Sequence, residues 1–385
     1  MKIKLIKIFF LLVTFCVLPS SASATLEVNN VSGTIADGQN ITISGAAFGS
    51  SGPSTEIFDD FEGGVAGDIV PLTSPKVGTW TGYNSLVPNQ PKYDSTAHSG
   101  AGSFRSFDGN THYTLSMIKT FDPATEGFVS FWVKLPAGTY FPGNTGDTAG
   151  SYPTNSAWKM TWFMDTPIGG GVANDDWTVP TWIGSGPAIS GNDQPATFWL
   201  DNDWWSFSNW VRVSYWMKAG VNQIVDNGNI WFQGLNEGVI QKTYTKNDIP
   251  LFNTISRGTS KDTDYHWRQL NIPGWMDTSY SGPNVRPVYD DIYVATGANA
   301  QARVEIGNAA TYAASTNLTI STVNSWSDAA VNATIRQGSF TDGQSAYVYV
   351  FDKDGNVNAS GFPVTFGSAV GDVIAPSAPA GLSVL

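Results

Sequence analysis

The chain has 385 residues, enough for two or three domains, and carries 32 Asp and Glu against 20 Lys and Arg, a net charge of −12. Nucleic acid and anionic membranes are disfavoured as partners, because both repel an acidic protein. Charged residues make up only 14% of the chain, and it contains 15 Trp and 40 Gly. This composition is typical of an all-β protein with many tight turns.

The first 24 residues have the features of a secretory signal peptide. Three lysines precede an apolar run at residues 8–18, and an Ala-Ser-Ala cleavage site follows at residues 22–24. The run is too short to span a membrane as a helix. Without the signal, 17 Lys and Arg remain against 32 Asp and Glu, a net charge of −15. We therefore expect an exported bacterial protein, secreted, periplasmic or at the cell surface, with no membrane insertion after cleavage. The only cysteine, Cys16, lies in the signal, which excludes disulfides from the mature chain.

The remaining chain predicts β-strands rather than helices. Short alternating segments recur between Gly, Asn, Asp and Pro clusters, as in sandwiches and barrels. Residues 26–49 predict two strands and a Gly-rich corner, and hairpin turns are expected at 226–228 and 352–356. Long Gly-, Pro- and Asn-rich stretches at 138–155 and 166–195 predict binding-edge loops or disorder. The strands expected between the two ends lie at 57–61, 103–107, 112–121, 127–135, 156–165, 196–201, 209–218, 229–234, 239–244, 267–272 and 288–294.

The two ends of the chain carry motifs of one domain. The front segment has an I-S-G-x-x-F-G corner, formed by Ile43, Ser44, Gly45, Phe48 and Gly49. The back segment has a V-x-I-G strand, a W-S-D motif and a hairpin glycine, at 304–307, 326–328 and Gly355. This pattern resembles the IPT/TIG family of immunoglobulin-like domains. The resemblance implies a discontinuous immunoglobulin-like β-sandwich at 25–55 and 298–370, followed by a linker or the start of a further domain at 371–385. The alternative is two unrelated β segments that flank a sandwich. Insertion into a surface loop between close termini is physically inexpensive.

Residues 56–297 would then form the inserted domain. The segment begins EIFDDFEGG and ends VYDDIYVATG, and it resembles the concanavalin A-like lectin/glucanase (LamG-like) jelly rolls. The resemblance implies a jelly-roll β-sandwich whose first and last strands lie side by side, in a fold that often binds carbohydrate. Asp59, Asp60, Asp290 and Asp291 would meet at the ends of those strands as ligands of a structural calcium ion, or serve only as edge charges.

The predicted strands share an alternation in which one face is apolar and the other mixes aromatic, amide and cationic side chains. Aromatic rings suit the C–H faces of sugars, amides suit hydroxyls, and cations suit uronates or sulfates. The alternative is an ordinary outer face with half-buried tryptophans and extended lysines. Trp204, Trp205 and Trp210 fit either a sugar platform or core packing. The predicted carbohydrate-binding residues are Trp132, Lys134, Lys159, Arg212, Trp216, Lys218, Trp231 and Gln233.

Enzymatic motifs are incomplete. The Glu-x-Asp-x-x-Glu strand of glucanases is absent. YWMKAGVNQ at 215–223 resembles an alginate-lyase strand, but the companion R-x-E-x-R and Q-I-H strands are missing, and His98, His112 and His266 are the only histidines. The sequence therefore favours a non-catalytic protein that binds an extracellular polysaccharide, with its site between Glu56 and Gly297. A polysaccharide lyase acting on a uronate polymer and a structural or adhesion module are the alternatives.

Overall fold

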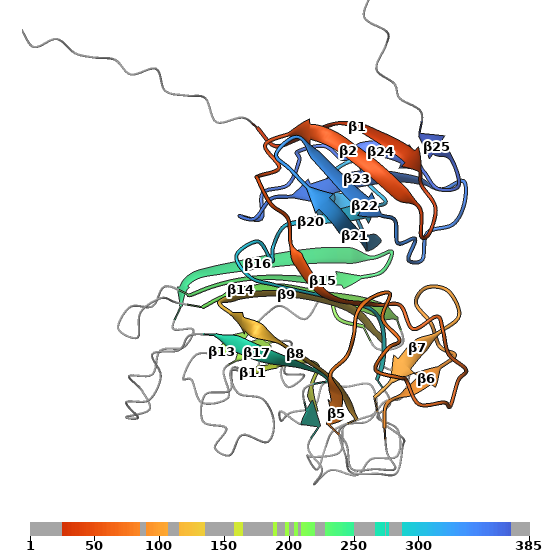
Figure 1. Cartoon of the computed structure of the whole chain (residues 1–385), viewed down its shortest axis with the longest axis vertical. Helices are drawn as coiled ribbons and strands as arrows, with labels where there is room; N and C mark the ends of the chain where they lie inside the picture. The colour runs from red at the N-terminus through yellow and green to blue at the C-terminus, as the bar shows by residue number, and fades with distance from the viewer. Residues whose placement is uncertain are drawn as a thin grey trace, which may run out of the picture.

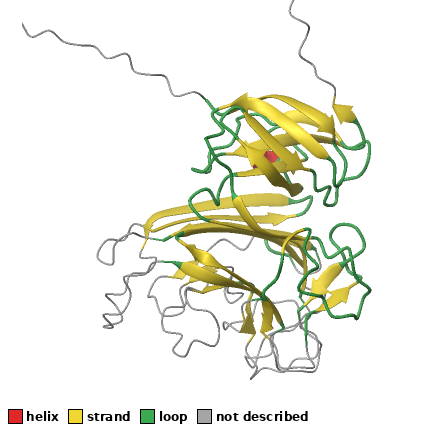
Figure 2. Ribbon diagram, in the orientation of Figure 1, coloured by secondary structure: helices red, strands yellow, loops and turns green. Residues whose placement is uncertain are grey.

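The fold is all-β. The computed structural model describes residues 25–84, 90–106, 115–134, 158–164, 188–190, 197–199, 204–206, 209–219, 228–249, 266–273, 275–276 and 287–370. Strands dominate these residues, with one short 3₁₀ helix, Tyr312–Ala314 (Figure 2). The described residues contain no candidate membrane-spanning helix. The all-β prediction is confirmed. The predicted signal peptide and the C-terminal linker lie outside the described residues.

The two ends of the chain join in one eight-stranded antiparallel arrangement, which we call the split unit (Figure 1). Strand β2 pairs with β22, and β1 pairs with β25, so the front segment closes against the back one. The order is β24-β23-β20-β21-β22-β2-β1-β25. Strand pairing thus joins the two segments expected to form one interrupted unit, while membership of the IPT/TIG family remains a prediction. The strands are β1 (Glu27–Thr34), β2 (Asn40–Ala46), β20 (Arg303–Gly307), β21 (Leu318–Trp326), β22 (Ala330–Thr334), β23 (Ser345–Phe351), β24 (Phe362–Thr365) and β25 (Ala369–Val370).

Strand alternation builds the core of the split unit. Val304 and Ile306 on β20 face inward and pack with Ile41 and Ile43 of β2 and with Val348 of β23. Because successive strand residues point to opposite faces, Arg303 and Glu305 on β20 must point the other way. That outward direction is where the rest of the molecule lies.

The inserted unit is the sandwich formed by strands β3 to β19 (Figure 1). Its larger sheet has nine strands, ordered β16-β15-β14-β9-β19-β3-β4 with β7 and β6 attached beside β19, and its smaller sheet is ordered β11-β17-β8-β5. The nine strands are β3 (Ser54–Asp59), β4 (Val77–Gly78), β6 (Lys92–Asp94), β7 (Ser103–Arg105), β9 (Glu126–Lys134), β14 (Trp210–Lys218), β15 (Gly228–Asn236), β16 (Ile240–Ile249) and β19 (Val288–Thr296). The smaller sheet contains β5 (Gly82–Asn84), β8 (Ser116–Ala124), β11 (Trp162–Met164) and β17 (Trp267–Ile272). Two short pairs complete the unit, β10 (Trp158–Lys159) with β18 (Trp275–Met276) and β12 (Ala188–Ser190) with β13 (Thr197–Trp199).

The apolar face of the nine-stranded sheet forms the main core against the smaller sheet. Val129, Val213 and Phe232 lie in this core, as the alternation predicts for β9, β14 and β15. Strands β3 and β19 pair antiparallel, in agreement with the expected neighbourhood of the first and last strands. Trp204 and Trp205 are buried in the same core, which supports core packing over a sugar platform. The predicted turn at 352–356 is present, and the Asp352 N–H donates to the Asn356 carbonyl across it. The predicted turn at 226–228 and the predicted loops at 138–155 and 166–195 lie mostly outside the described residues.

One predicted strand is wrong. Residues 156–165 do not form a single strand, because Met160 and Phe163 both enter the core and the alternation breaks between them. The two pieces, β10 and β11, pair with β18 and β17 rather than with the nine-stranded sheet. Lys159 therefore does not share a face with Arg212. Its side chain is outside the described part of the structure.

Candidate functional site

The outer face of the nine-stranded sheet carries most of the predicted binding residues, but its centre faces the split unit. Trp132, Arg212 and Gln233 project from β9, β14 and β15, and all three are at most 2% exposed. Trp132 packs in one cluster with Tyr312 and Phe351 of the split unit. The expectation that this face is open to solvent is therefore corrected at its centre, because the split unit covers it. We call these three residues, with Ser130 and Ser214, the covered centre.

A buried ion pair joins the two units at the covered centre. Arg212 Nη1 donates to Glu305 Oε2 at 2.7 Å, and Arg303 Nε donates to Glu305 Oε1. Burial alone would raise the pKa of Glu305, but the positive charges of Arg212 and Arg303 outweigh burial and hold it below its ordinary value. The Arg303 guanidinium also lies 3.5 Å from the Phe351 ring centroid. These charges are paired and desolvated, so they hold the units together and are not accessible to a ligand.

Further hydrogen bonds reinforce the same contact. Gln233 Nε2 donates to Tyr312 Oη at 2.7 Å, and Tyr312 Oη donates to Glu305 at 3.2 Å. On the sheet side, Arg212 Nε donates to Ser130 Oγ at 2.9 Å. The amide and cation that suggested sugar recognition therefore bond to buried groups of the protein itself.

A histidine network lies beside Trp132. The His98 ring stacks on Trp132 at 3.8 Å and is fully buried, with Nδ1 3.0 Å from Asp291 Oδ2 and Nε2 3.3 Å from Glu237 Oε1. Glu237 in turn accepts a hydrogen bond from Ser339 Oγ of the split unit at 2.7 Å. Burial alone would lower the pKa of His98, but its hydrogen bonds to Asp291 and Glu237 outweigh burial, and the net shift is upward. A buried, doubly paired imidazole positions the units and does not serve as an accessible base.

One end of the outer face remains open, and we call it the end strip. It consists of Trp216 and Lys218 on β14 and Trp231 on β15. Trp216 and Trp231 are half-buried and directly opposite each other across the two strands. The Lys218 side chain is 45% exposed, and its ammonium lies 2.9 Å from Glu126. These three are the predicted binding residues that the structure brings together on an accessible surface.

The tryptophans of the end strip are held in fixed positions. Trp216 Nε1 donates to Glu126 Oε2 at 3.2 Å. Trp231 stacks against Phe128 at 6.2 Å, and the Arg303 guanidinium lies 4.9 Å from its ring centroid. Beyond Trp231 the row continues to Thr245 on β16, which is exposed. The two rings are thus anchored on one side and partly exposed on the other.

Lys134 lies at the opposite end of the face. It is half-buried, and its ammonium is 5.8 Å from the Trp210 ring centroid. Lys134 pairs with Trp210 across β9 and β14, away from Trp216 and Trp231. It is therefore separated from the end strip by the covered centre.

The four aspartates predicted to hold calcium lie on or next to the paired strands β3 and β19. Asp59, however, accepts hydrogen bonds from Ser74 Oγ, Trp80 Nε1 and Phe61 N, and burial raises its pKa to about 6. The carboxylate of Asp290 accepts from three backbone N–H groups, of His98, Ser99 and Asp291, and burial raises its pKa well above the ordinary value. Across the described ranges, no group of three or more His, Cys, Asp or Glu side chains is arranged to hold a metal ion. The residues present do not fit a calcium site, because the oxygens of Asp59 and Asp290 already accept N–H and O–H donors.

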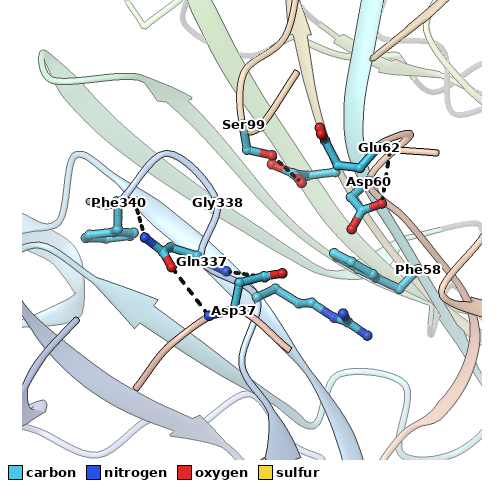
Figure 3. Close-up of a pocket in the computed structure, with 11 residues that line it drawn as sticks. Asp37, Phe58, Asp60, Glu62, Ser99, Gln337, Gly338 and Phe340 are labelled. Atoms are coloured by element: carbon cyan, nitrogen blue, oxygen red, sulfur yellow. Dashed lines mark hydrogen bonds between the residues drawn. The ribbon is translucent and has the colours of Figure 1, made fainter. Parts of the chain in front are cut away.

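A pocket of about 340 Å³ opens where the two units meet, and we call it the junction pocket (Figure 3). Asp60, Glu62 and Ser99 of the inserted unit line one side, and Asp37 and Gln337 of the split unit line the other. Its lining comes from both units, so the expectation of a site confined to 56–297 does not describe this pocket. Asp37 and residues 336–340 carry no motif and lie about 300 residues apart in the chain, so no sequence signal pointed to them.

The residues of the partial lyase motif are not arranged as a base. Tyr215 is buried, its hydroxyl is 2.7 Å from Thr161 Oγ1, and burial raises its pKa well above the ordinary value. Gln223 and His112 lie outside the described residues. The buried Tyr215 is therefore unsuited to proton abstraction from a polymer.

Comparisons with known proteins add two solved structures. No family model matches the chain, and no curated protein sequence matches it. The chain is similar to a cellulose induced protein, Cip1, with 18% identity and a TM-score of 0.34, covering 62% of this chain and 97% of that one. It is also similar to the marine PL-14 alginate lyase from Aplysia kurodai, with 13% identity and a TM-score of 0.34, covering 54% of this chain and 87% of that one. Likenesses at this level do not establish a function.

Proposed function

We propose that this exported protein binds an extracellular polysaccharide along the end strip and does not cleave it. The observation that carries the proposal is the pair of half-exposed tryptophans, Trp216 and Trp231, opposite each other on neighbouring strands. Side chains so paired lie about 5 Å apart at their β-carbons, so the two rings present neighbouring apolar surfaces on one face of the sheet. The apolar faces of sugar rings suit such a surface, and its polar borders suit their hydroxyls.

An extended strip favours a polymer over a single sugar. The row Trp216–Trp231–Thr245 runs across three strands, β14, β15 and the exposed edge strand β16. Strands are spaced about 4.8 Å apart, so three of them span about 10 Å, longer than one sugar ring. Fixed rings also lose little side-chain freedom on binding, which reduces the cost of association.

The charge of the strip supports stacking more than ionic recognition. Arg212 is buried against Glu305, and Lys218 is paired with Glu126. The cations that favoured a uronate or sulfated ligand are thus largely neutralised by the protein itself. We therefore favour a polymer recognised through its ring faces, with Lys218 as a secondary contact at the border.

Glycan-array binding of the mature chain tests the proposal. We expect at least one polysaccharide to bind, and Trp216→Ala and Trp231→Ala each to weaken binding about tenfold or more. Trp216→Phe should retain part of the affinity because it keeps an aromatic face. Trp326→Ala is the matched control, since Trp326 is a half-buried tryptophan on the split unit that packs on Phe48.

Two outcomes would contradict the proposal. Binding of no glycan at all would favour a structural or adhesion module. Turnover of a uronate polymer, read as unsaturated products that absorb ultraviolet light, would favour the lyase alternative.

A further inference from the structure

We propose that the junction pocket is a second binding site, separate from the end strip, which takes a single neutral sugar unit. The pocket volume of about 340 Å³ is at the lower end of the range for small-molecule sites, about 300–1,000 Å³. Such a size suits one sugar ring rather than a polymer in mid-chain. The inference does not depend on the proposed function, because the pocket shares no residue with the end strip.

The pocket presents hydrogen-bond acceptors on its inserted-unit side. Asp60 uses one carboxylate oxygen, Oδ1, to accept from the Glu62 N–H at 3.3 Å and to face the Lys76 ammonium at 3.7 Å. Its other oxygen, Oδ2, accepts no hydrogen bond from the described residues. Asp291 adds a second carboxylate, fixed by Ser99 Oγ at 3.0 Å and by His98. These acceptors are preorganised by the protein and match the hydroxyl donors of a sugar.

The opposite side presents an underused donor. Arg336 lines the pocket with its guanidinium 4.8 Å from the Phe58 ring centroid. Within the described part of the chain it makes a single hydrogen bond, of 3.4 Å, to Thr322 Oγ1. A guanidinium has five N–H donors, so most of the donors of Arg336 are left for other acceptors. A ligand that donates to Asp60 and accepts from Arg336 must carry both kinds of group on a small frame, as the hydroxyls of a sugar do.

Charge selects among the sugars. Four carboxylates line the pocket, those of Asp37, Asp60, Glu62 and Asp291, against the single guanidinium of Arg336. A uronic acid or a sulfated sugar would bring a further negative charge into this partly enclosed space, which is costly at reduced dielectric. The pocket therefore selects neutral sugars over their uronates.

The position of the pocket gives binding a structural consequence. Asp60 belongs to the inserted unit and Arg336 to the split unit, so one ligand would contact both. A ligand that binds only the joined arrangement stabilises it by mass action. Saturation with the sugar should thus raise the melting temperature of the whole chain.

Calorimetric titration with glucose, galactose, mannose and the matching uronic acids tests the inference. We expect at least one neutral hexose to bind with a millimolar Kd, and its uronate to bind about tenfold or more weakly. Asp60→Asn and Arg336→Gln should each lower hexose affinity about tenfold or more, whereas Lys353→Gln, at an exposed lysine of the split unit, should not. Melting curves of each variant establish that it is folded.

The end-strip variants separate this inference from the proposed function. Trp216→Ala should leave hexose affinity unchanged, and Arg336→Gln should leave polysaccharide affinity unchanged. Hexose binding lost only in Trp216→Ala would assign the sugar to the end strip and overturn the pocket. Absence of hexose binding, or stabilisation by Ca²⁺ alone that Asp60→Asn removes, would also overturn it.

Discussion

The covered centre and the end strip lie on the same face of the same strands, yet only the covered centre is buried by the split unit. Arg212 and Trp216 are four residues apart on β14 and point the same way. Arg212 is buried beneath the split unit and paired with Glu305, whereas Trp216 is half-buried at the margin of the contact. The difference is set by where the split unit ends, not by the type of side chain on the sheet.

A sheet face that carries polar and aromatic side chains indicates that something binds it, but not what binds it. Such a face must find partners, and those partners can be another part of the same chain. In the covered centre the partners are Glu305, which accepts a hydrogen bond from Arg212, and Tyr312, which accepts one from Gln233. The split unit reaches the end strip through Arg303, which lies over Trp231, but Trp216 and Trp231 stay half-buried, so the ligand hypothesis is retained there.

Removal of the central carboxylate should have the largest effect. Glu305→Ala leaves Arg212 and Arg303 buried without their counter-charge, so we expect a loss of about 5 kcal/mol in the free energy of unfolding, at the upper end for a broken buried pair. Urea unfolding measures this loss in the free energy of unfolding. A loss below about 1 kcal/mol would mean that the centre is hydrated and the units are not held together there.

The next largest effect on stability should come from truncating tryptophans, and it should differ between the covered centre and the end strip. Trp132→Ala should cost about 3–5 kcal/mol because a large buried ring is lost, while Trp216→Ala should cost less than half as much because the ring is partly exposed. Equal losses in thermal or urea unfolding would contradict the division of this face.

Acid should weaken the covered centre in a defined direction. The pKa of Glu305 lies below its ordinary value of 4.5 in the folded protein, so its ion pairs contribute stability above pH 4.5. That contribution is lost as the pH falls through the folded pKa. We expect the urea midpoint of the wild type to drop between pH 5 and pH 3, and a variant with Arg212, Arg303 and Glu305 all replaced by apolar residues to drop less. Equal decreases in both proteins would assign the acid sensitivity to other groups.

The smallest effect on stability should come from the lysine of the end strip. Lys218→Ala breaks a partly exposed ion pair with Glu126 and should cost less than about 1 kcal/mol. Arg212→Ala, on the same strand and face, should cost about 3–5 kcal/mol. Urea unfolding measures both losses. A larger loss of stability for Lys218→Ala than for Arg212→Ala would contradict the burial of Arg212 beneath the split unit.

Local pattern predicted most strands of the inserted unit. Strands β9, β14, β15, β17 and β19 fall close to the expected ranges, because period-two alternation reports directly which residues are buried. The pattern failed at residues 156–165, where a break between Met160 and Phe163 places both in the core. Periodicity cannot register such a break when aromatic and sulfur-containing residues occupy both faces.

The site was harder to predict, because its environment depends on contacts between distant segments. The alternation placed Arg212, Trp216 and Gln233 on one face, which is correct, but it carried no information about what covers that face. One signal was present: Arg303 and Glu305 alternate with Val304 and Ile306 on a short strand, and charged residues on a buried strand require charged partners. The junction pocket had no such signal.

Tryptophan footprinting by hydroxyl radicals, read by mass spectrometry, tests the division of the face most directly. We predict oxidation of Trp216 and Trp231 in the free protein, little or none at Trp132, and protection of the first two by the polysaccharide that binds. Oxidation of Trp132 at a rate similar to that of Trp216, or unchanged oxidation of Trp216 and Trp231 in the complex, would contradict the account.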